Sequence, residues 1–261
     1  MPSHYAHYRF GAAVLPKMPA DLRKVVTRYR RLYDVGLHGP DFFFFYNPLA
    51  KNRFDLLGSQ LHLQSGNVFF TRVCRGLRLV PSEEAQAYLY GVLCHYVLDS
   101  HCHPLVNAQA ELGTAGHTEI EMEFDRFLLE LDGKIPPHTQ NISRHMVLMS
   151  REMQIVARFY PGTTEQTVAI GLKNMALTTR VFATKSSSAR KLLSTGVGIV
   201  RKKQQDFFIP ETPNPLCAHL DEPLLALYQQ AEEKFPQLLL QLTSHLTYNA
   251  PLDQAFDPIF G

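Results

Sequence analysis

His95 and Asp99 stand four residues apart in the sequence, and His117 and Glu121 repeat that spacing. On an α-helix, side chains four residues apart emerge on one face with their β-carbons about 5 to 6 Å apart, so each pair can converge on one ion. A single pair of this kind more often makes only a surface hydrogen bond, but two pairs on successive helices indicate a metal site. Eight of the 12 histidines fall within the first 117 residues, and neutral imidazole is a common ligand for Zn²⁺.

Further candidate ligands lie between and before the two pairs. His101 and His103 follow Asp99 in the run DSHCHP, where Pro104 predicts that the helix ends and lets a ligand turn away. Upstream in the sequence, the candidates that would complete the sets of metal ligands are His7, Asp41 and His62. A set of imidazoles and carboxylates without thiolates favours catalytic zinc over a structural finger. Asn107 is a candidate to orient one of the ligands.

These residues resemble the zinc-dependent phospholipase C proteins, which share their helical fold with the single-strand-specific zinc nucleases. That family holds three zinc ions through an early His, an Asp, a His, then His-x-x-x-Asp, a further His and His-x-x-x-Glu. The same order occurs here within residues 1 to about 130, at His7, Asp41, His62, His95, Asp99, His103, His117 and Glu121. The order and the two four-residue spacings make the resemblance specific.

The resemblance implies that Asp41, His62, His95 and Asp99 hold one zinc ion. His7 and Asp99 would hold its neighbour, with Asp99 bridging the two, and His103, His117 and Glu121 would hold a third. Paired zinc ions lower the pKa of a bridging water from about 15.7 to about 7 and clamp the negative charge that develops on phosphoryl oxygens. Asp41 is the candidate to orient or deprotonate that water, so Asp41 and Asp99 are the expected catalytic residues.

Three features depart from the family pattern. Secreted members use the amine and carbonyl of a cleaved N-terminus as zinc ligands, whereas this sequence starts MPSHYAH, so either His4 substitutes or the bridged ion is poorly held. The step from Asp99 to His103 is shorter than in the family, which keeps His101 as a rival for that position. The membrane-binding calcium domain of the toxin members is not evident.

The expected function is therefore a zinc-dependent phosphodiester hydrolase of the phospholipase C type, with two or three Zn²⁺ ions and a small phosphodiester or a phospholipid as substrate. One alternative is the same chemistry on single-stranded nucleic acid. The absence of Trp and the small net charge of +2 argue against the nucleic-acid alternative, because a nuclease needs aromatic side chains that stack on bases and a basic groove. A second alternative is a non-catalytic module in which zinc only holds helices together.

The composition limits the class of protein. A chain of 261 residues that is 45% hydrophobic and 11% aromatic has enough apolar surface for a substantial core, which excludes a wholly disordered protein. No apolar run reaches about 18 residues and the N-terminus lacks the pattern of a secretion signal, so we expect a cytoplasmic protein without a transmembrane segment. The four cysteines contain no Cys-x-x-Cys pair and are expected to be reduced.

The elements that must position the ligands are predicted to be helices. Apolar residues at spacings of three and four predict helices over 19–34, from Ser82 to just before Pro104, and over 116–131, 141–159, 163–184 and 221–247, with a kink at Pro236. No segment alternates as a strand. The fold class is all-α, a multi-helix bundle of the phospholipase C and nuclease type, in one domain over 1–261 with a Pro-rich connection at 209–223.

Two further stretches carry alternatives. Residues 185–203 collect six basic residues and no acid, which suits lipid headgroups or phosphates but is more typical of a solvated segment, and no site is assigned there. The run Phe42 to Phe45 suits a lipid-accepting pocket but is more often simply core. The histidines without a partner pattern are expected to be structural: His38, His138, His145, His219 and His245.

Overall fold

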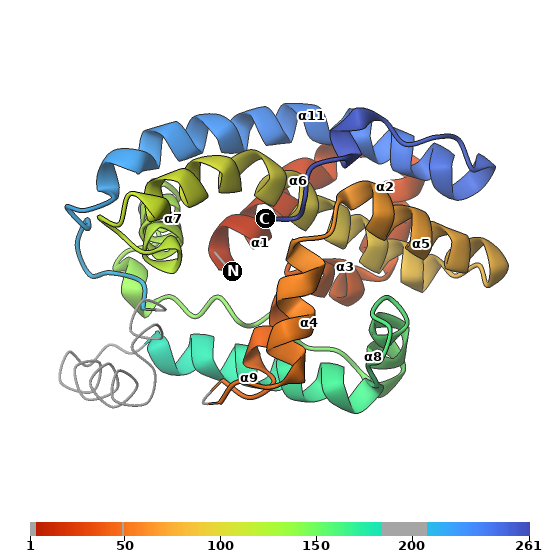
Figure 1. Cartoon of the computed structure of the whole chain (residues 1–261), viewed down its shortest axis with the longest axis horizontal. Helices are drawn as coiled ribbons and strands as arrows, with labels where there is room; N and C mark the ends of the chain where they lie inside the picture. Colours follow the sequence, from red (N-terminus) through yellow and green to blue (C-terminus); the bar gives the residue numbers. More distant parts are fainter. Residues whose placement is uncertain (1–3, 49, 184–207) are drawn as a thin grey trace.

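The computed structural model describes residues 4–48, 50–183 and 208–261 (Figure 1). These residues form an all-α fold, as predicted, and the described ranges contain no β-strand, only an isolated bridge between Ser65 and Ile259. No helix among them is long and apolar enough to cross a bilayer. The predicted single domain over 1–261 stays a prediction, and the basic stretch 185–203 lies outside the described residues.

The first half of the chain contains seven helices within its described part. They are α1 (His4–Val14), α2 (Ala20–Arg28), α3 (Arg30–Gly36), α4 (Arg53–His62), α5 (Gly66–Leu79), α6 (Glu83–Glu111) and α7 (His117–Leu131). A short 3-10 helix, η2, spans Asp41–Phe45. The second half contributes α8 (Ser150–Ala157), α9 (Glu165–Phe182) and α11 (Asp221–Tyr248).

Helix α6 is the central element of the bundle, with α3, α11, α1 and α7 packed against it (Figure 1). It begins at Ser82, whose hydroxyl accepts a hydrogen bond from the Ala85 amide, as an N-cap residue should. Gly36 and Gly91 allow α3 to cross α6 closely, because a β-carbon at either position would meet the backbone of the other helix. Buried side chains on several sides of α6 show that the core surrounds it.

The prediction that the helix ends before Pro104 is wrong, because α6 continues through Pro104 to Glu111. Proline removes one backbone donor and disfavours a helix interior, but tertiary contacts can outweigh that cost. Val106 is buried in the core beyond the proline, and Asn107 bonds to His117 on the next helix. These contacts keep the last turns of α6 helical.

Two other predicted helices differ from the structure. The helix expected over 19–34 is broken at Tyr29, whose φ of −113° and ψ of 44° separate α2 from α3. The helix expected over 141–159 forms only as α8, since the residues before Ser150 are irregular. In both segments most of the apolar residues contribute to the core. The backbone that buries them is interrupted at Tyr29 in the first segment and is irregular before Ser150 in the second.

The remaining helix predictions are confirmed. Helix α7 begins after Gly116 and is followed by Gly133, which has a φ of +69° that glycine adopts readily. Helices α9 and α11 lie within two residues of the predicted ranges, and α11 contains Pro236. The Pro-rich connection before α11 includes only one short 3-10 turn among its described residues, Ala218–Leu220.

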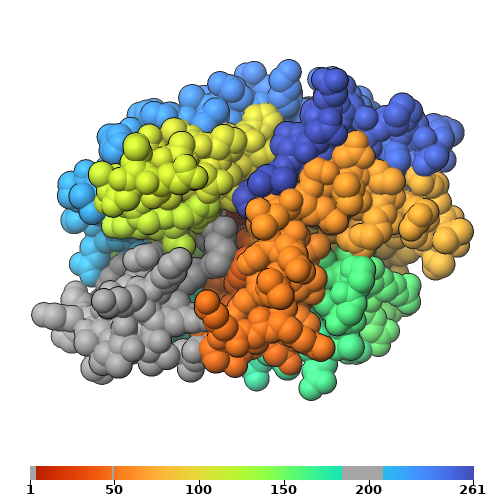
Figure 2. Space-filling model, viewed as in Figure 1, coloured from red at the N-terminus to blue at the C-terminus, as the bar shows by residue number. Residues whose placement is uncertain are grey.

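The last residues of the chain return to the middle of the molecule. The segment after α11 lies between α7 and the α4–α5 pair on the face seen in Figure 2. It is held by backbone hydrogen bonds from Gly66 N to Pro258 O (3.0 Å) and from Gly261 N to His62 O (3.1 Å). The ring of Phe260 packs among the rings of Phe69, Phe70 and Tyr96.

Candidate metal centre

One stripe of helix α6 carries three of the predicted ligands. His95, Asp99 and His103 follow each other at intervals of four residues, so they lie on one face, and Asn107 continues the stripe by one more turn. All three predicted ligands are buried, with 1%, 3% and 4% of their surface exposed. The continuation of α6 through Pro104 therefore places His103 in line with the other two from within the helix, where the sequence had suggested a turn away from it.

The other predicted ligands come from four different elements. His117 and Glu121 occupy the first turns of α7, and His7 lies in α1. Asp41 begins η2, and His62 is the last residue of α4. All of them are buried except His117, whose side chain is 29% exposed. The structure thus gathers all eight predicted residues around one stretch of α6.

Specific contacts hold these elements in place. The carboxylate of Asp125 in α7 accepts hydrogen bonds from the amides of Tyr5 and Ala6, at 2.9 and 2.8 Å, and so caps the N-terminus of the helix that carries His7. Gly39, with a φ of +47°, passes so close to His95 that a β-carbon would lie 2.5 Å from the imidazole Cδ2. Only glycine fits there, and this close passage brings Asp41 to the centre.

Three groups of side chains have the spacing of metal ligands. They are His7 with His95 and Asp99, Asp41 with His62 and His95, and His103 with His117 and Glu121. Within each group the candidate ligand atoms lie within 4.8 Å of one another. The third group is the trio that the resemblance implies, and the first two share His95 and contain the other five predicted residues.

The hydrogen bonds of three imidazoles indicate which ring nitrogen of each is available to a metal ion. The Nδ1 atoms of His62, His95 and His117 lie 2.8 Å from Gly58 O, 3.3 Å from Leu37 O and 2.9 Å from Asn107 Oδ1. An oxygen acceptor at Nδ1 places the proton of a neutral imidazole there and leaves a lone pair on Nε2. Each of these Nε2 atoms is buried and accepts no hydrogen bond from the described residues.

Each of those lone pairs faces a carboxylate oxygen. His62 Nε2 lies 3.0 Å from Asp41 Oδ1, His95 Nε2 lies 3.0 Å from Asp99 Oδ2, and His117 Nε2 lies 3.4 Å from Glu121 Oε1. Two acceptors at this distance repel unless a proton or a metal ion lies between them. Two ligands on one tetrahedral zinc ion, at about 2.0 to 2.2 Å from the metal, are about 3.3 Å apart, so the residues present fit zinc.

Asp99 lies at the middle of the centre. Its Oδ1 is 3.1 Å from His7 Nε2 and 3.6 Å from His103 Nε2, while its Oδ2 faces His95. One carboxylate between three imidazoles has the geometry of a bridging ligand, because its two oxygens point toward different imidazoles. This position agrees with the bridging role that the resemblance implies for Asp99.

The electrostatics of the centre keep its carboxylates ionised. Burial alone would raise the pKa of Asp41, but the neighbouring His95 and His62 lower it to about 2. The same balance holds the pKa of Asp99 well below its ordinary value, with burial opposed by His103, His95 and His7. Burial lowers the pKa of His103, against the opposing effect of Asp99 and Glu121. Ionised carboxylates and neutral imidazoles are the forms that bind metal.

The two histidines considered as substitutes lie outside the three groups. His101 bonds through Nδ1 to the carbonyl of Val97 at 2.7 Å, so the structure places His103 at the centre and His101 beside it. His4 is buried but lies against Thr179, with 3.2 Å from its Nδ1 to the hydroxyl oxygen. Burial lowers the pKa of His4 to about 4, so its ring is neutral.

Several residues near the centre had no signal in the sequence. Phe260 lies with its ring centroid 6.2 Å from that of His95, and a β-carbon at Gly261 would collide with Nδ1 of His103. Neither residue belongs to a motif. His38 and His145, which were expected to be structural, lie side by side with 2.6 Å between their Nε2 atoms. Asn107 does bond to a ligand, as proposed from its position.

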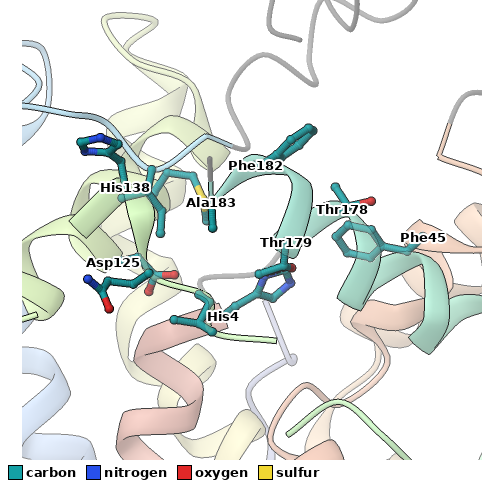
Figure 3. Close-up of a pocket in the computed structure, with 12 residues that line it drawn as sticks. His4, Phe45, Asp125, His138, Thr178, Thr179, Phe182 and Ala183 are labelled. Carbon is teal, nitrogen blue, oxygen red and sulfur yellow. Dashed lines mark hydrogen bonds between the residues drawn. The ribbon is translucent and has the colours of Figure 1, made fainter. Parts of the chain in front are cut away.

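A pocket with a cavity volume of about 30 Å³ lies beside His4 (Figure 3), near the centre, and none of the eight predicted ligands lines it. Phe45, Thr179 and Phe182 line it together with His4, and Met122 next to the ligand Glu121 adds a further apolar wall. Phe42 and Phe43 are fully buried in the core, whereas Phe45 lines this pocket, and its role in accepting lipid stays a prediction. The pocket combines apolar walls with hydroxyl and imidazole groups.

The fold and the centre together define an all-α protein with buried groups of imidazoles and carboxylates that could bind metal. The family model described as zinc dependent phospholipase C matches residues 6–160, which is more than half of the chain and contains every predicted ligand. The chain belongs to the zinc-dependent phospholipase C family. No curated protein and no solved structure matches it.

Proposed function

We propose that this protein is a zinc-dependent hydrolase of phosphodiesters, with a phospholipid or a related small phosphodiester as its substrate. The observation that carries the proposal is the set of three buried imidazole lone pairs that face carboxylate oxygens at 3.0 to 3.4 Å. Hydrogen bonds to oxygen at each Nδ1 fix the ring orientation, as is usual for histidines that bind metal. Membership of a zinc-dependent family supports zinc as that metal.

The proposed ligands are the eight residues at the centre. His103, His117 and Glu121 would hold one ion, and the other five would hold two ions that share Asp99. Zinc ions in such a site supply hydroxide from bound water at neutral pH and neutralise charge on the phosphoryl oxygens. In the overall reaction, water adds across the ester P–O bond to give a phosphomonoester and an alcohol.

Asp41 is the proposed residue for orienting the attacking water. Its carboxylate is fully buried and ionised, and neither oxygen accepts a hydrogen bond from the described residues. It can therefore accept a hydrogen bond from water next to the centre and take up a proton as the water attacks. Asp99 would act differently, as the bridging ligand that fixes the distance between two ions.

The pocket beside His4 supports a substrate with an apolar part. Phe45, Met122 and Phe182 offer apolar contacts, while Thr179 and His4 offer polar ones at the side nearer α1. A nuclease would instead need aromatic platforms for successive bases and a basic groove. The pocket lining contains no Lys or Arg among the described residues, which favours the phospholipid alternative.

Three substrates offered to the purified protein would test this proposal: phosphatidylcholine, a single-stranded oligonucleotide and a chromogenic phosphodiester. We expect cleavage of the phospholipid and the chromogenic ester, loss of activity on chelation and recovery with added zinc. Cleavage of the oligonucleotide alone would establish the nuclease alternative. Zinc binding with no cleavage of any substrate would establish the metal-stabilised module.

A matched pair of variants tests the ligand assignment in the same assay. His103→Gln should lower both zinc content and activity, because His103 belongs to the third group. His101→Gln changes the same residue type only two positions away, where Nδ1 bonds to a backbone carbonyl, and should retain zinc and activity. Equal loss in the two variants would contradict the assignment. A cytoplasmic location remains a prediction.

A further inference from the structure

A second hollow lies on the outer side of α9, away from the metal centre. It is an open groove of about 490 Å³ between α9, α8 and the irregular segment that precedes α8. Its floor is apolar and includes the buried residues Met146, Leu148 and Leu172. Three cationic side chains line it: Arg144 from the irregular segment, and Lys173 and Arg180 from α9. We call this surface the α9 groove.

The charged side chains that line the α9 groove among the described residues are all positive. Arg144, Lys173 and Arg180 are exposed, and none of them makes an ion pair with another residue in the part of the chain that the structure describes. No acidic residue is among the described residues that line the groove. Some other exposed cations of the described residues, such as Arg28 and Arg151, pair with a glutamate, whereas others, such as Arg75 and Arg158, make no ion pair there either. The groove therefore presents unneutralised positive charge.

Exposed aliphatic side chains lie among these cations. Val147 is 59% exposed and Leu177 is 53% exposed, and both line the groove. Lys173, Leu177 and Arg180 follow one another at spacings of four and three on α9, so the cations flank the leucine on one helix face. Large apolar side chains exposed next to cations are typical of surfaces that bind the headgroup region of a bilayer.

We propose that the α9 groove is the surface by which this protein docks on a membrane that contains anionic phospholipids. Lys173, Arg180 and Arg144 would contact the headgroup phosphates and carboxylates, while Val147 and Leu177 would enter the boundary between headgroups and acyl chains. Charge complementarity selects this partner over a second copy of the chain, since two identical cationic grooves repel in a symmetric contact. The groove has no aromatic side chain among its described lining residues, so it offers no stacking platform for bases.

A single layer of protein separates the α9 groove from the pocket beside the metal centre. In the irregular segment, Gln140 and Ile142 line the pocket, whereas Asn141 and Ser143 line the groove. On α9, Thr178, Thr179 and Phe182 line the pocket (Figure 3). Leu177 and Arg180 line the groove. Docking at the groove would therefore hold the pocket close to a lipid surface.

Vesicle flotation with the purified chain of 261 residues tests this inference. We expect stronger binding to phosphatidylcholine vesicles that contain phosphatidylserine than to phosphatidylcholine alone, and weaker binding as salt is raised. Each positive charge near an anionic surface contributes about a fivefold factor, so Lys173→Gln with Arg180→Gln should lower the partition coefficient about 25-fold. Leu177→Asp should lower it on its own, because a carboxylate is repelled where the leucine enters.

Helix α5 supplies a matched control. Arg75 and Leu79 are exposed and stand four residues apart, as Lys173 and Leu177 do on α9. Arg75→Gln with Leu79→Asp is the counterpart, on a different face, of Lys173→Gln with Leu177→Asp, and should leave vesicle binding within about twofold of the unchanged protein. All these positions are exposed, so the variants should fold, which circular dichroism would verify.

Four outcomes would overturn the inference. They are no binding of the unchanged protein to anionic vesicles, equal binding by the groove variants, equal loss in the α5 control, and a dimer in sedimentation that the groove variants dissociate. The last outcome would assign the groove to a second copy. Flotation does not require turnover, so a protein that hydrolyses no phosphodiester still tests the groove, and failure of one proposal is separate from failure of the other.

Discussion

Two buried charged clusters lie on the same helix, α7, and they differ in what balances their carboxylates. At the start of α7, Glu121 faces His117 and His103. Further along, Glu123 and Asp221 surround Arg126, with Nε 2.7 Å from Glu123 Oε1 and Nη2 3.4 Å from Asp221 Oδ2. The second cluster contains its own permanent cation. The first contains imidazoles, which carry no permanent charge and can share a metal ion with the carboxylate.

This difference separates a metal site from a structural ion cluster. Burial of a charge is costly in both cases, so each cluster must be neutralised by a partner. Arg126 neutralises its cluster by hydrogen bonds that guanidinium makes well with carboxylates. At the candidate metal centre, an oxygen atom accepts the Nδ1 proton of each of three histidines, so that each Nε2 atom faces a carboxylate oxygen with its lone pair. Changes to the metal ligands should therefore lower activity and zinc content. Removal of Arg126 should instead lower the stability of the fold.

The largest effect is expected from Asp99→Asn. Asp99 approaches three imidazoles, and its replacement removes a shared negative ligand while keeping the shape of the side chain. Phosphodiester hydrolysis should fall by at least about 10³-fold and zinc content should fall, with the helical circular dichroism spectrum retained. Normal hydrolysis by Asp99→Asn would show that Asp99 does not bridge two ions.

Arg126→Met should instead destabilise the fold. The change leaves Glu123 and Asp221 buried without their cation, which costs about 3 to 5 kcal/mol in the free energy of unfolding. Urea denaturation measures this loss. Zinc per folded chain should not change, because Arg126 belongs to the other cluster. A variant as stable as the unchanged protein would remove the contrast between the two clusters.

Asn107→Ala should weaken metal binding without affecting the Arg126 cluster. The side-chain oxygen of Asn107 accepts the Nδ1 proton of His117, and loss of such a partner typically lowers metal affinity about 10- to 100-fold. Competition with a chelating dye measures this loss. Asn107→Asp keeps an acceptor oxygen and should retain most of the affinity. Identical affinities in the alanine variant and the unchanged protein would mean that the hydrogen bond does not orient His117.

The smallest effect is expected from Asp221→Asn and depends on pH. Burial and the nearby Glu123 raise the pKa of Asp221 from 3.8 to about 7. Between these values the folded state holds a proton that the unfolded chain releases, so this group lowers stability as pH rises toward 7 and has a constant effect above it. From pH 4 to 8, the variant should gain about 1 to 2 kcal/mol relative to the unchanged protein, after allowance for screening by solvent.

Measurement of urea denaturation at several pH values checks the Asp221 prediction. The same change at Asp99 is the comparison, since both replace a buried aspartate by asparagine. Asp221→Asn should retain zinc and hydrolysis. A relative stability that does not change with pH would show that Asp221 is already ionised in the folded protein at low pH.

The sequence predicts the parts of the centre that depend on local spacing. The two four-residue pairs, His95 with Asp99 and His117 with Glu121, follow directly from helix geometry, and the structure brings each pair together. The order of His7, Asp41 and His62 was informative only through the resemblance to a family. Their convergence depends on how distant elements pack, which no local pattern encodes.

Other features could not be predicted because they depend on tertiary contacts. Pro104 predicts a helix end from local sterics, but the packing of Val106 and Asn107 continues the helix and aligns His103 with Asp99. The capping of α1 by Asp125 joins residues about 120 positions apart. Gly261 reaches His103 only because the C-terminal segment returns to the centre. None of these contacts has a signal in the sequence near it.

Elemental analysis of metal per chain tests the central claim most directly. Protein purified without chelator from a medium that contains zinc should hold close to three zinc ions per chain, and Asp99→Asn should hold fewer, while Asp221→Asn should match the unchanged protein. A zinc content at background level in the unchanged, folded protein would contradict the account, because the buried imidazole lone pairs would then face carboxylates without a metal ion.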